Sequence, residues 1–364
     1  MMSDIFVYFG TYTRREATGA GRSEGIYIYN LNRESGALTP VGTMSGVENP
    51  SFLALNPAKT HLYAVAELGD GDGKPMGGVS AFAVDSKTGF LELLNSEASK
   101  GDGPCHLSVD ASGTKVLVSN YGSGSVAVLP LADDGSLLPA SDSVQHEGSS
   151  INPQRQQGPH AHSVNLDSNN RFAYVADLGL DKILIYAFDA DAGTITANRA
   201  QPWAKVKAGA GPRHFAFHPN NQYAYVINEL DSTMTVFAFD GDKGTLDEIQ
   251  TLSTLPDDFD GTSYCAEVRV HPNGKFVYGS NRGHDSIAVF KVQDDGSLKT
   301  VEYTSSQGEF PRNFNLDPSG EWLIAANQNT HNVFVYQVDT KTGKLTATDQ
   351  SAVIPYPVCV KFLG

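Results

Sequence analysis

The chain repeats one unit six times between Ser51 and about Gln350, and this repetition limits the folds it can adopt. Each unit begins with a short apolar segment and a turn that contains Asx or His, often followed by Pro. The six turns are Asn56-Pro57, Asp110-Ala111, Asp167-Ser168, His218-Pro219, His271-Pro272 and Asp317-Pro318, whose second residues lie 46 to 57 positions apart. The repeat favours one domain over residues 1–364, although the length alone would allow two or three.

The segments after each turn alternate between apolar and polar residues with the period of two that is typical of β-strands. In one unit the second strand is Tyr223-Ala224-Tyr225-Val226-Ile227, and a third strand begins at Met234. A glycine turn at Lys243-Gly244 then leads into a fourth strand. The unit therefore has four antiparallel strands joined by hairpins, and we find no helical period of useful length.

Six units leave three strands at the start, at about 5–12, 25–31 and 37–44, and one strand at the end, over 358–363. Three strands and one strand make a seventh unit. Pairing the two ends of the chain inside one blade would close the array into a ring and cover its exposed strand edges. The sequence thus predicts an all-β fold, a seven-bladed β-propeller with four antiparallel strands per blade.

The charge balance narrows the range of partners. The chain carries 26 Lys and Arg against 41 Asp and Glu, a net charge of −15, and has no basic stripe for nucleic acid or an anionic membrane. Its three cysteines are an odd number without metal-ligand spacing, which favours a reducing compartment. The first residues have no cationic or long apolar stretch, so we expect a cytoplasmic protein. The closed ring predicts a monomer or a weak homodimer.

Two positions of the repeat vary where a structural residue would recur. The first channel position lies six residues before the second turn residue, and the second channel position lies ten residues after it. The first position holds Ser51, Cys105, His162, Arg213, Ala266 and Arg312, and the second holds Glu67, Tyr121, Leu178, Glu229, Arg282 and Gln328. The residue before the second position is usually Asn or Asp, which we assign to turn hydrogen bonding. If both positions face one channel mouth, His162, Arg213, Glu229 and Arg282 form one cluster with Arg312 nearby.

Such a cluster has two interpretations. Exposed charges usually form rim salt bridges that contribute little. A chain of net charge −15 that gathers several arginines and a histidine at one opening would instead bind a carboxylate, a phosphate or an oxyanion. We expect His162, Arg213, Glu229 and Arg282 to be catalytic, and Arg312, Arg155, His160 and Glu67 to bind substrate.

Other histidines and two long loops add weaker candidates. His160 and His162 alternate along a strand and could share a zinc ion, but no third ligand with suitable spacing is visible, so we expect no metal. His214, His218 and His271 occupy regular repeat positions, and we expect each to be satisfied by a backbone group. The polar loops at 14–23 and 148–157 could carry binding groups, Arg155 in the second loop and, less so, Arg14 and Arg15 in the first.

Several motifs together resemble those of a known family. They are Gly10-Thr11-Tyr12-Thr13, Gly158-Pro159-His160-Ala161-His162-Ser163, Gly211-Pro212-Arg213-His214-Phe215-Ala216-Phe217-His218-Pro219-Asn220, Asn228-Glu229-Leu230, Asn281-Arg282 and Pro311-Arg312-Asn313-Phe314. Over its whole length the chain resembles the propeller-type 6-phosphogluconolactonases, a family that also includes the fungal 3-carboxy-cis,cis-muconate lactonizing enzyme. The muconate enzyme's site is attributed to a His, two Arg and a Glu, whose motifs match His162, Arg213, Glu229 and Arg282. The resemblance implies no metal and no cofactor.

The resemblance implies hydrolysis of an anionic sugar lactone, with 6-phosphogluconolactone of the pentose phosphate pathway as the first candidate. Hydrolysis needs a base for the attacking water and donors for the oxyanion. We assign the base to Glu229 or His162 and the oxyanion to Arg213 and Arg282; a neutral His162 could instead protonate the leaving alkoxide. Two alternatives remain, an intramolecular lyase that cyclises a muconate and a non-enzymatic interaction scaffold.

Overall fold

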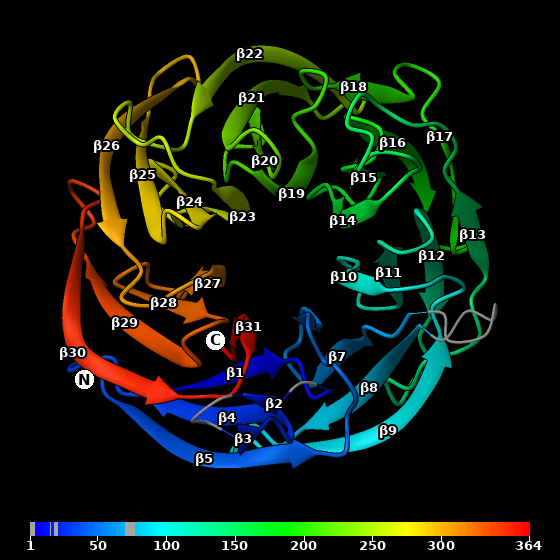
Figure 1. The fold of residues 1–364 in the computed structure, drawn as a ribbon. Helices are drawn as coiled ribbons and strands as arrows, with labels where there is room; N and C mark the ends of the chain where they lie inside the picture. Colours follow the sequence, from blue (N-terminus) through cyan, green and yellow to red (C-terminus); the bar gives the residue numbers. More distant parts are fainter. Residues whose placement is uncertain (1–3, 15, 18–20, 70–76) are drawn as a thin grey trace.

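Seven four-stranded antiparallel sheets stand around a central channel, as the sequence predicted (Figure 1). The computed structural model describes residues 4–14, 16–17, 21–69 and 77–364. In each sheet the paired strands run in order from the channel outward, so the innermost strand lines the channel and the outermost strand forms the outer wall. No helix occurs in these ranges, and hence none that is long and apolar enough to cross a membrane.

Four blades come from the first part of the chain and its last strand, in order from the inner to the outer strand. The first blade consists of β31 (Pro357–Phe362), β1 (Ile5–Thr11), β4 (Gly25–Leu31) and β5 (Leu38–Ser45). The second consists of β6 (Leu53–Leu55), β7 (His61–Ala66), β8 (Gly78–Val84) and β9 (Leu91–Ala98). The third consists of β10 (Pro104–Val109), β11 (Lys115–Asn120), β12 (Ser125–Pro130) and β13 (Asp142–Gln145). The fourth consists of β14 (Ala161–Leu166), β15 (Phe172–Asp177), β16 (Lys182–Asp189) and β17 (Thr194–Ala197), with β18 (Trp203–Lys205) also paired to β16.

The remaining blades follow the same order. The fifth consists of β19 (Pro212–Phe217), β20 (Tyr223–Asn228), β21 (Thr233–Asp240) and β22 (Thr245–Ser253). The sixth consists of β23 (Tyr264–Val270), β24 (Phe276–Arg282), β25 (Ser286–Val292) and β26 (Leu298–Ser305). The seventh consists of β27 (Pro311–Leu316), β28 (Trp322–Asn327), β29 (Asn332–Val338) and β30 (Leu345–Val353). A short hairpin, β2 (Glu16–Ala17) with β3 (Gly21–Arg22), lies outside the blades.

The ring closes inside the first blade. The last strand of the chain, β31, pairs antiparallel with β1, and Val7 lies opposite Phe362. The two ends of the chain thus meet as neighbouring strands, as the strand count predicted. Because this pairing occupies the free edge of β1, that edge is not exposed to another chain.

Adjacent blades are joined by a repeated hydrogen bond from a buried tyrosine. Tyr8, Tyr63 and Tyr278 each donate their hydroxyl, at 2.9 Å, to the carbonyl of the glycine in the next blade's last hairpin. These glycines, Gly89, Gly135 and Gly343, have φ values of 75°, 82° and 78°, a conformation that side chains with a Cβ rarely adopt. The glycine turns that mark the repeat in sequence thus accept the same hydrogen bond from the neighbouring blade.

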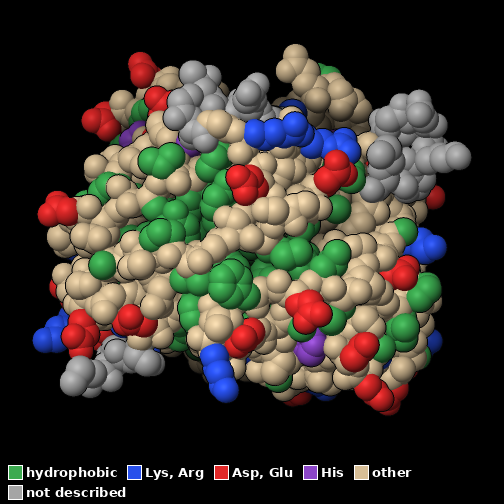
Figure 2. Space-filling model, turned by 90° about the horizontal axis from the view of Figure 1, so that it is seen from below, with side chains coloured by type: hydrophobic (Ala, Val, Ile, Leu, Met, Phe, Trp, Pro, Cys, Tyr) green, Lys and Arg blue, Asp and Glu red, His purple; other side chains and the backbone are tan. Residues whose placement is uncertain are grey.

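Seen from the side, hydrophobic side chains gather in the middle of the outer wall, and acidic and basic side chains are scattered around them (Figure 2). The two exposed large hydrophobic residues of β9 and its hairpin, Phe90 and Leu93, are 49% and 48% exposed. In this view a few basic side chains lie next to one another at the upper rim, and acidic side chains are spread over the rest of the wall, in agreement with the net negative charge (Figure 2).

Candidate active site

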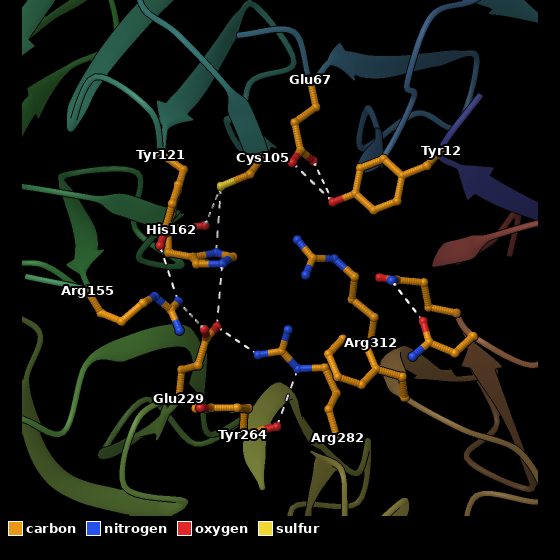
Figure 3. A pocket seen from close by; sticks show the side chains of 13 residues that line it. Tyr12, Glu67, Cys105, Tyr121, Arg155, His162, Glu229, Tyr264, Arg282 and Arg312 are labelled. Atoms are coloured by element: carbon orange, nitrogen blue, oxygen red, sulfur yellow. Dashed lines mark hydrogen bonds and ion pairs between the residues drawn. The ribbon is translucent and has the colours of Figure 1, made fainter. Parts of the chain in front are cut away.

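A cavity of about 450 Å³ opens at one mouth of the channel, which we call the upper mouth (Figure 3). Every blade or its connecting loop contributes to its wall. The lining residues are Tyr12, Glu67, Cys105, Tyr121, Arg155, His162, Glu229, Tyr264, Arg282, Phe310, Arg312, Gln328 and Asn329. The volume is that of a pocket for one small metabolite.

Bulges in the inner strands aim side chains at this cavity. In β10, β14, β19 and β27 the strand register shifts around one unpaired residue at the second position of the strand. These unpaired residues are Cys105, His162, Arg213 and Arg312, the first channel position of four blades. A bulge breaks the regular up-and-down alternation of side chains along a strand and changes the direction of its extra residue. The same bulge in four blades therefore directs the side chain of one repeat position toward the channel mouth.

The second channel position ends the neighbouring strand, where the Asx residue before it fixes the turn. Asn120, Asn281 and Asn327 are fully buried, and each donates from Nδ2 to a backbone carbonyl of the loop that precedes its inner strand. This hydrogen bonding confirms the structural role predicted for the Asx residues. These hydrogen bonds also fix the residue after each Asn at the mouth of the channel. Those residues are Tyr121, Arg282 and Gln328, and all three line the cavity.

Glu229 is the centre of the charged cluster. Its carboxylate accepts from Arg155 Nη2 at 2.6 Å, and Arg213 Nε and Arg282 Nη2 reach its Oε2 at 3.0 and 2.8 Å. His162 Nε2 lies 3.9 Å from the same oxygen. Burial alone would raise the pKa of Glu229, but Arg282, Arg213 and the other cations outweigh it and hold this pKa well below its usual range. Glu229 is therefore a permanent anion that binds three guanidinium groups.

A second carboxylate faces the cavity from the opposite side (Figure 3). Both oxygens of Glu67 accept from the Tyr12 hydroxyl at 3.1 Å, and Ser51 Oγ also donates to Oε2. No arginine, lysine or histidine of the described chain lies within ion-pairing distance of it. A carboxylate has about four lone-pair sites, so Glu67 retains acceptor capacity that Glu229 has lost.

Arg312 extends into the middle of the cavity (Figure 3). Its guanidinium lies 5.6 Å from the centre of the Tyr12 ring, and no hydrogen bond or ion pair holds it to another described residue. Burial acts to lower the pKa of Arg312, but the neighbouring Tyr12 and Glu67 reverse this and raise it. Arg312 is thus a cation whose donors remain available to a ligand.

His162 and Cys105 form part of the cavity floor. Cys105 Sγ lies 3.6 Å from His162 Nδ1 and 3.3 Å from the His162 carbonyl oxygen. Burial raises the pKa of the Cys105 thiol above its usual range, and the nearby Glu67 adds to this. Burial and the charge of Arg213 hold the pKa of His162 well below its usual range. At neutral pH the pair consists of a thiol and a neutral imidazole.

Six of the eight predicted site residues line this cavity: His162, Glu229, Arg282, Arg312, Arg155 and Glu67. Arg213 does not. It lies behind Glu229, where Nη1 donates to the Ala266 carbonyl at 2.5 Å. His160 does not line the cavity either, because its ring stacks on Tyr121 at 4.5 Å and its Nδ1 contacts the Tyr121 carbonyl oxygen.

The weaker candidates lie elsewhere. Arg14 pairs with Glu48 at 3.1 Å on the surface, and Arg15 lies outside the described residues. His218 and His271 contact the carbonyl oxygens of Gly274 and Gly320, as predicted. The prediction for His214 was wrong, because its Nδ1 pairs with the Glu267 side chain at 3.1 Å rather than with the backbone. The described ranges contain no group of three or more His, Cys, Asp or Glu placed to hold a metal ion.

The selection by charge missed seven lining residues: Tyr12, Cys105, Tyr121, Tyr264, Phe310, Gln328 and Asn329. A signal existed for three of them, because Cys105, Tyr121 and Gln328 occupy the two channel positions. Phe310 lies 5.0 Å from the Arg282 guanidinium and has a φ of 64°, which no sequence pattern indicates.

The fold and the site together define a seven-bladed propeller with an arginine-rich cavity at one mouth of its channel. The model of the family described as "Lactonase, 7-bladed beta-propeller" matches residues 6–362, and the chain belongs to this family. A curated relative, the 6-phosphogluconolactonase of Bacillus subtilis, is 40% identical over 363 residues, which covers 100% of this chain and 99% of the relative.

Two solved structures are also similar to this chain over nearly its whole length. The periplasmic gluconolactonase PpgL of Pseudomonas aeruginosa is 30% identical with a TM-score of 0.91, over 100% of this chain and 99% of that one. A structure from Bacteroides fragilis is 34% identical with a TM-score of 0.90, over 99% and 98% of the two chains.

Proposed function

We propose that the protein hydrolyses the ring ester of a sugar lactone, with 6-phosphogluconolactone as substrate and 6-phosphogluconate as product. One observation carries this proposal. Within the described residues, the cavity and its floor hold four guanidinium groups against two carboxylates, in a chain of net charge −15. This local excess of positive charge suits a substrate that is a phosphate monoester and becomes a carboxylate.

Arg312 and Arg282 stabilise the oxyanion that forms when water attacks the lactone carbonyl. The Arg312 guanidinium forms no hydrogen bond or ion pair with any residue that the structure describes, and Arg282 is fixed by Glu229 and by the carbonyl of Cys265, to which Nη2 donates at 2.8 Å. Donors that are already oriented need no rearrangement as the charge develops, and this is the largest contribution in many acyl transfers. Arg213, which the sequence alone assigned to the oxyanion, positions Glu229 instead and does not contact the substrate.

Glu67 takes the proton of the attacking water. The other carboxylate, Glu229, is bound by three arginines and has little tendency to accept a proton. Among the described residues, the hydroxyls of Tyr12 and Ser51 hold the Glu67 carboxylate, which lines the cavity on the same side as Arg312. A base needs a free lone pair within reach of the water, and Glu67 meets this condition.

His162 assists the leaving ring oxygen. When the Cys105 thiol donates to Nδ1, the imidazole carries its proton on Nε2, on the side that faces Glu229 and the cavity. A neutral Nε2–H can donate to the alkoxide as the ring opens. No covalent intermediate is required, since the water attacks directly.

Arg155 binds the phosphate of the substrate. It comes from the long loop before β14 and donates from Nη2 to the Tyr121 hydroxyl at 3.3 Å as well as to Glu229. Its side chain is 34% exposed, so it lies at the rim, where the phosphate end of a bound lactone would emerge.

A second candidate substrate is the unphosphorylated gluconolactone, because a relative with a TM-score of 0.91 is described as a gluconolactonase. The muconate lyase alternative would use the same arginines for carboxylates. A coupled assay of the purified protein with 6-phosphogluconolactone, gluconolactone and 3-carboxy-cis,cis-muconate separates the three. We expect the highest kcat/KM for the phosphorylated lactone; preferential turnover of the muconate would overturn the proposal.

We also propose that the protein acts in the cytoplasm, within the pentose phosphate pathway, as a monomer or weak homodimer. Its three cysteines are free and buried, which suits a reducing compartment. Cell fractionation and light scattering test the location and the oligomeric state.

A further inference from the structure

The inner strands arrange their side chains in three tiers along the channel. The first channel position forms the upper tier. The next residue in each blade forms a middle tier, which consists of Phe52, His106, Ser163, His214, Glu267, Asn313 and Cys359. Two residues further along, a lower tier consists of Ala54, Ser108, Asn165, Ala216, Arg269, Asn315 and Lys361. Since a strand rises by about 3.3 Å per residue, the upper and lower tiers are roughly 10 Å apart.

The middle tier blocks the channel. The rings of Phe52 and His106 are 4.1 Å apart, and those of His106 and His214 are 5.3 Å apart. His214 pairs with Glu267, which also accepts from Asn313 Nδ2. This packed chain of side chains separates the active-site cavity from the opposite end of the channel, which we call the lower mouth.

A second cavity, of about 470 Å³, lies at the lower mouth. It is bounded by the ends of the inner strands and by the turns that follow them, including Pro57, Pro272 and Pro318. Its charged side chains among the described residues are Lys59, Arg269, Lys361 and Asp317, and the carboxyl-terminal residue Gly364 also lines it. Asp317 is already engaged, because its buried carboxylate contacts Arg33 Nε at 3.3 Å. The lower mouth is therefore cationic in an acidic protein.

The neutral polar residues of the lower tier have structural partners. Ser108 Oγ donates to the Val164 carbonyl at 2.6 Å, and Asn315 Nδ2 donates to the Val360 carbonyl at 3.1 Å. Both side chains thus support the neighbouring blade. Arg269 differs, because it gives one nitrogen, Nη2, to the Glu267 carboxylate at 3.3 Å, and its buried Nε has no hydrogen-bond partner among the described residues.

Lys361 has the fewest polar contacts of the charged residues in the lower tier. It is partly buried, its Nζ lies 4.6 Å from the centre of the Phe52 ring, and no hydrogen bond or ion pair joins it to any residue in the described ranges. Glu267 is shared by Arg269, His214 and Asn313. No ion pair within the described ranges compensates Lys361, and a partly buried charge of this kind is costly unless an anion binds it.

We propose that the lower mouth is a second binding site, for a tetrahedral oxyanion of the phosphate class, held by Lys361 and Arg269. The ligand is either free inorganic phosphate or the phosphate group of a small metabolite. Lys361 Nζ supplies three donors, and Arg269 supplies those nitrogens that Glu267 does not use. This site is independent of the catalytic cavity and does not rest on the proposed function.

The surroundings of Lys361 predict how the site responds to pH. Burial, and then the charge of Arg269, lower the pKa of Lys361 to about 8. The other titratable groups that face it are Glu267 on β23, His106 on β10, His214 on β19 and Cys359 on its own strand. A bound anion favours the charged amine, so sulfate, which itself does not titrate in this range, should bind more weakly as the pH rises through 8.

Calorimetric titration with inorganic phosphate at constant ionic strength tests the site. The background is the double variant Arg155→Gln, Arg312→Gln, which removes two of the three arginines that line the upper cavity and so weakens anion binding there. We expect phosphate to bind to this background, and the additional substitution Lys361→Gln to lower the affinity by about tenfold or more, the loss of one charge-assisted contact. Titrations with 6-phosphogluconate and gluconate then show whether the site also binds the phosphate group of a metabolite. We expect 6-phosphogluconate to bind and gluconate, which has no phosphate, not to bind.

Three results would overturn the proposal: no phosphate binding to the double variant, an unchanged affinity after Lys361→Gln, or gluconate binding as tight as phosphate binding. The single variant Lys361→Gln should keep the lactonase kcat/KM of the wild type, which shows that it folds. If it does not fold, Lys361→Arg serves instead: it keeps the charge without a titratable amine, so phosphate binding should remain while the weakening of sulfate binding near pH 8 disappears. Persistence of that weakening in Lys361→Arg also contradicts the assignment.

Discussion

Arg213 Nε donates to Glu229 Oε2 at 3.0 Å, and neither side chain reaches solvent to any extent. Glu229 lines the cavity and Arg213 lies behind it; Glu229 also pairs with Arg155 and Arg282, which line the cavity as well. The most specific sequence motif of the chain therefore encodes a support for the catalytic groups.

Replacing Glu229 with Gln should destabilise the protein and impair catalysis together. Three buried or half-buried guanidinium groups lose their counter-ion, and removal of one partner from a buried ion pair destabilises by about 3 to 5 kcal/mol. Urea denaturation measures the stability, and initial rates measure kcat/KM. The pH-rate profile should keep its acidic limb, because Glu229 is not the base; loss of that limb in Glu229→Gln would show that it is.

Replacing Glu67 with Gln should remove the base and preserve the fold. We expect kcat to fall by about 10² to 10⁴, the usual contribution of general base catalysis, with KM changed little. The matched control is Tyr12→Phe, which removes one donor to Glu67 and should have a much smaller effect on kcat. Retention of wild-type kcat by Glu67→Gln would transfer the role of base to His162.

Replacing Arg155 with Met tests recognition of the phosphate. KM for 6-phosphogluconolactone should rise by about tenfold or more, because a charge-assisted contact is lost, and KM for gluconolactone should stay unchanged. Arg199, which is exposed and far along the chain from the lining residues, supplies the control Arg199→Met. Equal effects of Arg155→Met on both lactones would mean that Arg155 does not bind the phosphate.

Replacing Cys105 with Ala should leave most of the activity. The thiol lies beside His162 in an arrangement that resembles a nucleophile and its base, but burial raises its pKa and keeps it protonated. We expect kcat within about tenfold of the wild type. A loss of several thousandfold, or a covalent adduct seen by mass spectrometry with a slow lactone, would instead identify Cys105 as a nucleophile.

The stability of the protein should fall in weak acid. Burial holds the pKa values of His106, His162 and His214 well below the usual value of 6.5. The unfolded chain therefore binds more protons than the folded protein below about pH 6.5, and stability falls as the pH decreases through this range. Each histidine contributes at most about 1.4 kcal/mol per pH unit. Urea denaturation at several pH values between about 7.5 and 5 measures the slope, which should be smaller in His106→Gln.

The repeat alone was sufficient to predict seven blades, four strands per blade and closure by the two ends of the chain. These properties follow from local patterns, because strand alternation, turn residues and glycine hairpins are determined by neighbouring residues. The same repeat located Arg282, Arg312 and Glu229 at the channel mouth, since equivalent positions in a ring of blades face the same axis.

The tertiary structure decided what these residues do. His162 and Arg213 share one repeat position, yet His162 lines the cavity and the longer Arg213 reaches across to the Ala266 carbonyl of the next blade. Glu67 and Glu229 share the other position, yet three arginines bind Glu229, whereas the hydroxyls of Tyr12 and Ser51 bind Glu67. The protonation and pairing of these side chains depend on their distances in space from residues of other blades. Such distances are set by the packing of the blades, and no local sequence pattern indicates them.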